Sequence, residues 1–185
     1  MSIQQALTDP SSLSTRQGTA QPPCWYAVHT RSRFERKVEA QLIARGIESF
    51  LPLLAQKHKW SDRQKIVQEP LFPGYIFVRE TLEAKRRLAV LQTTGVVEFV
   101  GAGGHGASIP DVQIENVRTL LTHNISFSPW PFLRAGQRVR IRGGSLDGIE
   151  GILLSKNADC SIVVSIDLIQ KSLAIRLKDY DLTII

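Results

Sequence analysis

The sequence predicts an α+β protein of two domains, in which an N-terminal α/β sandwich precedes a small five-stranded β-barrel. Over residues 24–124, strand-like alternation gives way several times to helical spacing, which is typical of one sheet packed against helices. Over residues 134–185, short alternating segments follow one another with glycine-rich turns and no helical period. That second pattern is typical of a small barrel.

The composition is that of an ordinary globular protein. The 185 residues are 43% hydrophobic and 22% charged, which is enough for a buried core in one large or two small domains. No apolar run is long enough to span a membrane and no signal peptide is recognisable, so we expect a cytoplasmic protein with no membrane partner. Cys24 and Cys160 lie far apart without a histidine cluster, which argues against a zinc site and a disulfide framework.

The net charge of +6 is modest for a protein that binds nucleic acid. Residues 24–124 carry 14 basic and 10 acidic side chains, and residues 125–185 carry 8 and 6. This balance permits contacts with phosphate groups but does not require them.

The N-terminal domain is expected to follow a disordered tail, residues 1–23, which is rich in Ser, Thr, Gln and Pro. Ser32 and Glu35 fit a capping box at the start of a first helix, and Gly46 suits the position just after its end. The other expected elements are strands over 25–30, 47–54, 75–78 and 96–100, a basic loop or hairpin over 56–68, a glycine-rich loop over 101–108, and helices after Thr81 and from Val112 or Ile114 to Asn124.

The stretch over residues 70–78 differs from an ordinary core strand. Pro73-Gly74 predicts a tight turn, and three aromatic residues crowd around it. Alternation then places Tyr75 and Phe77 on one face of the strand and the aliphatic residues on the other. An aliphatic face suits a core and an aromatic face suits a partner, so we predict a protein-docking surface here. Core filling is the alternative interpretation of Phe72 and Phe77, because a short aromatic run does not reveal its buried face.

The chain changes character at residues 125–133, where Pro129 and Pro131 interrupt every period and predict an interdomain linker. The five expected barrel strands then cover residues 137–142, 149–154, 161–168, 173–177 and 182–185.

No catalytic constellation is recognisable in the sequence. The four histidines are scattered, without a carboxylate or thiol at the spacing of a triad or a metal site. The glycine-rich loop over residues 101–106 lacks the Lys-Ser/Thr ending of a phosphate-binding loop. We therefore expect a binding protein without cofactor or metal, and not an enzyme.

Several motifs occur in a specific order along residues 24–185. They are Trp25-Tyr26, Phe34-Glu35, the stretch 70–78, Thr94-Gly95-Val96, Gly136–Gly143 and Leu146–Gly151. Together they resemble the NusG family of bacterial transcription elongation factors, the first four matching the family's N-terminal domain and the last two its KOW motif. The resemblance implies a factor that binds RNA polymerase during elongation and modulates pausing, and we expect it to be a monomer.

The resemblance also implies functional residues in the N-terminal domain. Docking to the clamp helices of the largest polymerase subunit is implied for His29, Lys37, Phe72, Pro73, Tyr75 and Phe77. Contact with non-template DNA is implied for Arg31, Gln41 and Arg45. Arg86 and Arg87 stand where one specialised relative carries a polar motif that touches the opposite side of the DNA cleft. This chain lacks that motif, but electrostatic contact with DNA is implied for its two arginines as well. A solvated surface is the alternative interpretation of these basic residues, because exposed charges are common on helices.

In the barrel, Gly148 matches the glycine of the KOW turn and is expected at positive φ. The family's loop for termination factor Rho or a ribosomal protein corresponds here to Asp167, Leu168, Ile169, Gln170 and Lys171. Since Leu168 and Ile169 replace the usual residues of that loop, we expect an exposed apolar patch there and a partner that differs from the family's usual one.

The favoured function is transcription antitermination of particular operons, because residues 69–75 and 168–170 resemble specialised paralogues. One alternative is a general elongation factor that also acts in Rho-linked termination. The other is an RNA-binding module associated with ribosomes, since Arg138, Arg140 and Arg142 could contact phosphates. No motif indicates whether the two domains dock on each other.

The β-branched residues of the barrel region generate a first prediction. Val163, Val164, Ile166, Ile169 and Ile175 disfavour a helix and favour strands. We therefore expect the circular dichroism spectrum of an isolated fragment, residues 130–185, to be that of a β-protein. A spectrum dominated by helix would show that the segment has a second fold.

Overall fold

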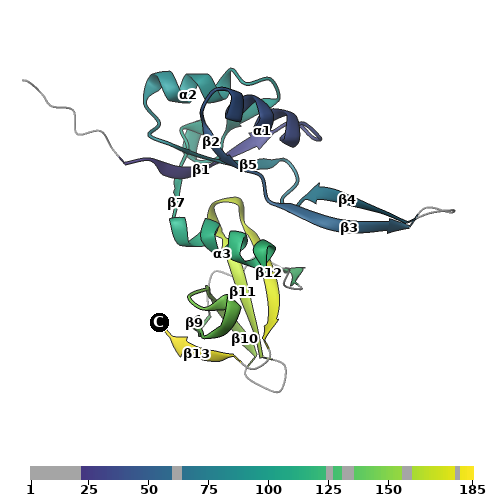
Figure 1. The fold of residues 1–185 in the computed structure, drawn as a ribbon. Helices are drawn as coiled ribbons and strands as arrows, with labels where there is room; N and C mark the ends of the chain where they lie inside the picture. Colours follow the sequence, from purple (N-terminus) through teal and green to yellow (C-terminus); the bar gives the residue numbers. More distant parts are fainter. Residues whose placement is uncertain (1–21, 60–63, 124–126, 131–135, 156–159, 178–179) are drawn as a thin grey trace, which may run out of the picture.

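The computed structural model has an N-terminal and a C-terminal domain that pack against each other (Figure 1). It describes residues 22–59, 64–123, 127–130, 136–155, 160–177 and 180–185. The expected tail over residues 1–23 therefore lies outside the described residues, apart from its last two positions.

The N-terminal domain contains the elements β1 (Cys24–Thr30), α1 (Glu35–Ala44), β2 (Glu48–Phe50), β3 (Leu53–Lys59), β4 (Gln64–Pro70), β5 (Tyr75–Glu80), α2 (Ala84–Leu91), β6 (Val96–Phe99), η1 (Ala102–Gly104), β7 (Ser108–Ile109) and α3 (Asp111–Thr122). Its antiparallel sheet has the strand order β2-β5-β1-β6, and β7 also pairs with β1. Strands β3 and β4 form a separate hairpin that projects from the domain, in the place of the predicted basic hairpin (Figure 1).

One face of this sheet packs under α1 and α2. Its core is aliphatic apart from Phe99 of β6, and it includes Val28 of β1, Ile76 and Val78 of β5, and Val38 and Leu42 of α1. Val38 and Leu42 lie four residues apart, so both point from the same side of the helix onto the sheet. The helical spacing seen in the sequence is thus the spacing of the residues that bury this face.

The start of α1 differs from the predicted capping box. The helix begins at Glu35, after Phe34, and no side-chain hydrogen bond caps it. Arg33 has φ of 65°, a turn conformation that keeps Ser32 outside the helix, and the Glu35 carboxylate binds another segment. The helix end is as predicted: Gly46 has φ of 69°, the left-handed conformation that suits a glycine after a helix.

The C-terminal domain contains β8 (Phe127–Trp130), β9 (Arg138–Arg142), η2 (Gly144–Leu146), β10 (Glu150–Ser155), β11 (Cys160–Ile166), η3 (Asp167–Ile169), β12 (Lys171–Leu177) and β13 (Asp181–Ile184). The strand order is β13-β9-β10-β11-β12-β8. Strands β9 to β13 are the five predicted from the sequence, and β8 adds a sixth.

Strand β8 occupies part of the predicted linker. Residues 127–130 pair with β12, in the register Leu173 to Pro129 and Ile175 to Phe127, while the rest of the predicted linker lies outside the described residues. Proline is tolerated at the edge of a sheet, because an edge strand needs hydrogen bonds on one side only. Pro129 therefore interrupts the hydrophobic pattern without preventing a strand.

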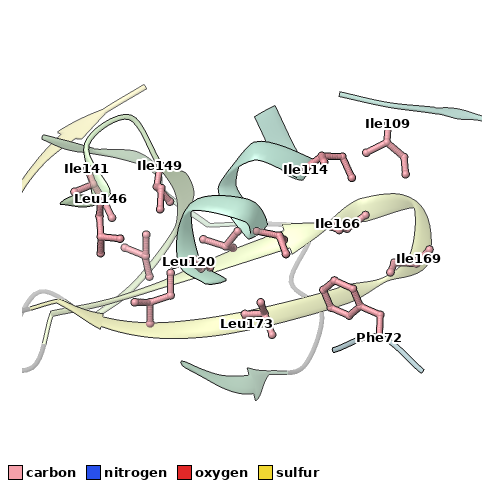
Figure 2. Packing of buried hydrophobic residues seen from close by; sticks show 14 of the residues in the cluster. Phe72, Ile109, Ile114, Leu120, Ile141, Leu146, Ile149, Ile166, Ile169 and Leu173 are labelled. Atoms are coloured by element: carbon pink, nitrogen blue, oxygen red, sulfur yellow. The ribbon is translucent and has the colours of Figure 1, made fainter. Parts of the chain in front are cut away.

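The two domains share one hydrophobic core. It joins Trp25 and Phe77 of the N-terminal sheet, through Leu120 of α3, to barrel residues such as Ile166 and Leu173. Figure 1 shows α3 between the sheet and the barrel, and Figure 2 shows the close packing of these side chains. The domains thus dock on each other in this structure, which no motif of the sequence indicates.

Two glycines with positive φ allow a matched test of packing within the N-terminal domain, where Phe34 packs against the core under α1 and α2. Gly95 has φ of 105°, and a Cβ there would lie 2.9 Å from the Cβ of Phe34; Gly46 has φ of 69° and nothing within 4 Å. We expect Gly46→Ala to lower the free energy of unfolding by about 1 kcal/mol through backbone strain. Gly95→Ala should cost about 1–3 kcal/mol more, because the added methyl group overpacks. Urea denaturation of both variants measures the difference, and equal losses would contradict the close approach.

Candidate protein-docking surface

The turn over residues 71–74 is held by the ends of two other elements. Gly74 has φ of 83°, and its carbonyl accepts a hydrogen bond of 2.8 Å from the backbone N–H of Thr30, at the end of β1. Its own N–H donates to Oε1 of Glu35, at the start of α1, over 2.8 Å. Since Glu35 is 5% exposed, a buried carboxylate fixes this turn. Glu35 therefore binds the Gly74 N–H and does not form the predicted capping box with Ser32.

The strand after the turn has the two faces predicted from its alternation. Ile76 and Val78 lie in the aliphatic core under α1 and α2, and Phe77 lies in the core on the opposite side of the sheet. Tyr75 is opposite His29 in the register of β5 and β1. The Tyr75 and His29 rings lie 5.5 Å apart at an angle of 32°, so they form a stacked pair on the aromatic side.

Phe72 precedes this strand and packs into the same aromatic side. Its ring meets Phe77 edge to face, with 6.2 Å between centroids and 89° between planes. Phe50 of β2 stacks on the other side of Phe77 at 6.1 Å. We name the four predicted residues His29, Phe72, Tyr75 and Phe77 the docking face.

The docking face is partly covered by the protein's own barrel. Phe72 is 3% exposed and Phe77 is 0% exposed, and Figure 2 shows Phe72 beside Ile169 and Leu173 of the barrel. His29 and Tyr75 are half-exposed, and Pro73 and Lys37 are exposed. In this arrangement, Phe72 is not free to meet another protein, contrary to the expectation of an open aromatic surface.

Hydrogen bonds between α3 and the barrel also hold the two domains together. The Gln113 side-chain amide donates to Oδ2 of Asp167 over 2.8 Å, and its oxygen accepts from the Asp167 backbone N–H over 3.1 Å. About one helical turn further along α3, Nδ2 of Asn116 donates to the carbonyl of Glu150 over 3.1 Å. Sequence reasoning missed Gln113 and Asn116; their signal was two amides on the side of α3 that also carries buried Val117 and Leu120.

The predicted partner loop of the barrel, residues 167–171, is therefore engaged within the chain. Ile169 is 6% exposed and Leu168 is half-buried against the shared core, so the expected exposed pair is not observed. Docking of the N-terminal domain covers it. Asp167, Gln170 and Lys171 remain exposed, and Gln170 has φ of 51° at the end of η3.

The residues implied for DNA contact have different surroundings. The Gln41 amide donates to the carbonyl of Thr94 over 3.2 Å, and Arg45 binds the carbonyl of Ala89 and, at 3.1 Å, the hydroxyl of Thr93. These contacts tie α1 to the segment after α2. Arg31 is exposed, and its side chain has no ion pair or hydrogen bond with another described residue.

The second pair of implied DNA contacts lies on α2. Arg87 donates to the carbonyl of Gly104 over 2.7 Å and covers the ring of Phe99. Arg86 lies 3.8 Å from the Glu80 carboxylate. Both arginines therefore have partners within the domain, and Arg31 is the most available of the five implied residues.

Further observations concern a predicted site residue and the chemistry of the described residues. Gly148 has φ of 85°, the positive value predicted for the KOW turn.

Desolvation raises the pKa of the Glu39 carboxyl on α1, while a hydrogen bond from the Leu51 backbone and the charge of Arg36 lower it. Within the described residues, no three His, Cys, Asp or Glu side chains are grouped as metal ligands, and no helix is long and apolar enough to cross a membrane.

Comparisons with known proteins find similar sequences and structures. Residues 23–118 match the family model described as "Transcription termination factor nusG". A "Transcription termination/antitermination protein NusG" of Borreliella burgdorferi is 29% identical over 150 residues, covering 71% of this chain and 81% of the relative. That of Bacillus subtilis is 33% identical over 107 residues, covering 52% and 60%. A solved structure titled "Domain interaction in Thermotoga maritima NusG" has a TM-score of 0.49 and 21% identity, covering 85% of this chain and 94% of that one.

The Glu35 contact generates a testable prediction. Glu35→Ala leaves the partly buried N–H of Gly74 without its acceptor and should lower the free energy of unfolding by about 1–3 kcal/mol. Glu35→Gln keeps an acceptor oxygen and should cost less, since it loses only the charge of the hydrogen bond. Urea denaturation measures both losses, and amide exchange at Gly74 reports the local effect. Equal losses for the two variants would contradict an acceptor role.

Proposed function

The chain belongs to the NusG family, and we propose from this premise that it binds RNA polymerase during elongation, reduces pausing and favours antitermination in particular operons. The N-terminal domain would grip the clamp helices of the largest polymerase subunit. The barrel would recruit a second partner, and its attachment to the first domain would raise that partner's effective concentration at the polymerase. No bond chemistry is part of this mechanism.

The observation that carries the proposal is the aromatic docking face on a rigid sheet. Its turn is fixed by hydrogen bonds from β1 and α1, and its half-exposed His29 and Tyr75 stack on each other. Aromatic side chains supply contact area at low entropic cost, because they have few rotatable bonds. A preformed surface of this kind suits a helical protein partner.

Full use of the docking face requires the domains to separate. Phe72 is buried under the barrel, so a polymerase contact that includes Phe72 needs an open form of the protein. The apparent affinity for polymerase is then the intrinsic affinity reduced by the fraction of open protein. The exposed residues His29, Tyr75, Pro73 and Lys37 offer a first contact that precedes opening.

Among the five residues implied for DNA contact, we propose Arg31 as the one that contacts the DNA. Gln41 and Arg45 are engaged with backbone carbonyls near the end of α2, so contact with DNA through them would first break these hydrogen bonds. Arg31 lies directly after β1 and adjoins the docking face. A non-template strand that passes the docked domain would meet this guanidinium first.

One observation counts against the RNA-binding alternative. Arg138 lies 3.6 Å from one carboxylate oxygen of Glu150, and Arg140 binds the other oxygen. An arginine neutralised by a carboxylate contributes less to phosphate binding. The basic strand β9 is therefore a poorer phosphate-binding surface than its sequence indicates.

Action as a general factor with Rho remains the alternative to operon-specific antitermination. A run-off transcription assay with and without Rho distinguishes the two functions.

Polymerase binding can be tested with matched tyrosine variants of the full chain. Tyr75→Ala should weaken retention on immobilised RNA polymerase about tenfold, because it removes a half-exposed aromatic contact. Tyr180→Ala, a half-buried tyrosine that contacts Ser145 in the barrel, is the control and should retain normal binding. Equal retention of both variants, or retention that needs RNA and falls steeply with salt, would contradict docking through this face.

The need for opening has its own test. Gln113→Ala removes both hydrogen bonds to Asp167 and should increase polymerase retention, since it raises the open fraction. Gln137→Ala makes the same chemical change at an exposed position of the barrel and should have no effect. Unchanged retention by Gln113→Ala would show that docking of the domains does not limit polymerase binding.

A further inference from the structure

The antiparallel register places Glu98 in one row with the two half-exposed rings of the docking face. Tyr75 of β5 is opposite His29 of β1, and His29 is in turn opposite Glu98 of β6. Residues directly opposite each other point to the same side of a sheet. Since neighbouring strands lie about 5 Å apart, the row from Tyr75 through His29 to Glu98 is about 10 Å long. Glu98 therefore extends the docking face by one strand.

Glu98 is an exposed carboxylate whose charge has no partner in the described part of the chain. Its side chain forms no ion pair or hydrogen bond with another described residue. The loop after β6 lies beside it, since a Cβ on Gly104 would be 3.5 Å from Oε2 of Glu98. That loop is tied to α2, because Arg87 donates to the Gly104 carbonyl over 2.7 Å. The Glu98 carboxylate thus has held backbone on one side and solvent on the other.

Other charged residues on this side of the sheet have ion-pair partners. Arg79 of β5 lies 3.9 Å from Glu48 of β2 and 3.5 Å from Asp111 of α3. Glu48 also lies 3.9 Å from Arg118. Among the described residues of β1, β2, β5, β6 and β7, Glu98 is the one Asp, Glu, Lys or Arg on the aromatic side without such a partner. Its charge is therefore available to another molecule.

Glu98 is accessible while the barrel covers part of the docking face. Phe72 and Phe77 are buried, whereas His29 and Tyr75 are half-exposed and Glu98 is exposed. A partner that approaches the protein therefore meets this row first. The charge acts on that partner before the rings touch it, because electrostatic attraction extends over about 8 Å at physiological salt.

The sign of this charge limits the kind of molecule that binds the row. A carboxylate repels the phosphates of nucleic acids, and it accepts strong hydrogen bonds from the guanidinium of Arg or the ammonium group of Lys. Next to it, the stacked rings of His29 and Tyr75 offer aromatic surface. A helix is about 10 Å wide, so a helix that packs on the rings brings its flank over Glu98. The row suits a helix with an apolar stripe and a Lys or Arg beside that stripe.

We propose that Glu98 is a specificity-determining residue of the docking face, and that it binds a Lys or Arg on the polymerase helix that packs on His29 and Tyr75. This inference rests on the proposed function and deepens it, since it states which charge the polymerase surface carries at this point. A charge at the rim of an interface attracts the correct surface before contact and repels a surface of like charge. Glu98 thus increases the association rate and selects a basic docking site.

The test compares Glu98→Gln with Tyr75→Ala in the full chain. Glu98→Gln keeps the size of the side chain and removes its charge. On immobilised RNA polymerase, its association rate constant should be about three- to tenfold below that of wild type at about 0.05 M salt. The two rates should converge at about 1 M salt, where electrostatic attraction extends over about 3 Å only. Tyr75→Ala removes aromatic contact and should bind more weakly at both salt concentrations.

Two further variants separate the local charge from net charge. Glu98→Lys reverses the charge and should lower the association rate constant by about another three- to tenfold at low salt. Asp181→Asn changes the net charge of the protein by the same amount as Glu98→Gln, at an exposed position of β13, and should associate like wild type. Because these positions are exposed, all three variants should unfold at the urea concentration that unfolds wild type.

Three results would overturn the proposal: Glu98→Gln associating as fast as wild type at low salt while Tyr75→Ala is impaired, Asp181→Asn slowing association as much as Glu98→Gln, or Glu98→Lys associating faster than wild type. The last result would indicate a phosphate or an acidic surface opposite Glu98. If wild-type protein is not retained, or if Tyr75→Ala binds as wild type does, the proposed docking itself is wrong and this inference falls with it.

Discussion

The burial of Phe72 in a core shared by both domains is the contact on which the rest of the structure depends. Phe72 comes from the turn before β5, packs edge to face on Phe77 and lies beside Ile169 of the barrel. A buried aromatic side chain stabilises whatever covers it, because its apolar surface is removed from water. The same burial that joins the domains also withdraws part of the docking face, so stability of the closed form and access for a partner oppose each other.

Helix α3 contacts both the N-terminal sheet and the barrel. Its sheet-facing side is held by Arg118 between two aromatic rings, and its barrel-facing side is held by amides that bind Asp167 and the Glu150 carbonyl. Hydrogen bonds of this kind contribute about 1 kcal/mol each when exchanged with water, so a partner of ordinary affinity can displace them. Modest contacts between the domains are compatible with the domain separation that the proposed function requires.

The elements were largely predictable from the sequence, and the pairing of the domains was not. Period-two alternation correctly separated the aliphatic and aromatic sides of β5, and the glycines at 46 and 148 were predicted at the positive φ values observed. The capping box at Ser32 was wrong, because Glu35 binds Gly74, 39 residues away in the chain. The segment interrupted by prolines was predicted to be a linker, but its residues 127–130 form strand β8. This strand accommodates Pro129 because it lies at the edge of the sheet.

The sequence by itself determined which residues share a face, since the geometry of strands and helices converts local spacing into direction. Tertiary structure alone decided which faces meet. Phe72 and Ile169 lie in the same buried cluster, and Gln113 is bound by Asp167, 54 residues further along the chain; no local period relates positions so far apart. An aromatic face indicates that something must cover it. Whether that cover is a partner or the chain's own barrel depends on the complementarity of surfaces that form only after both domains have folded.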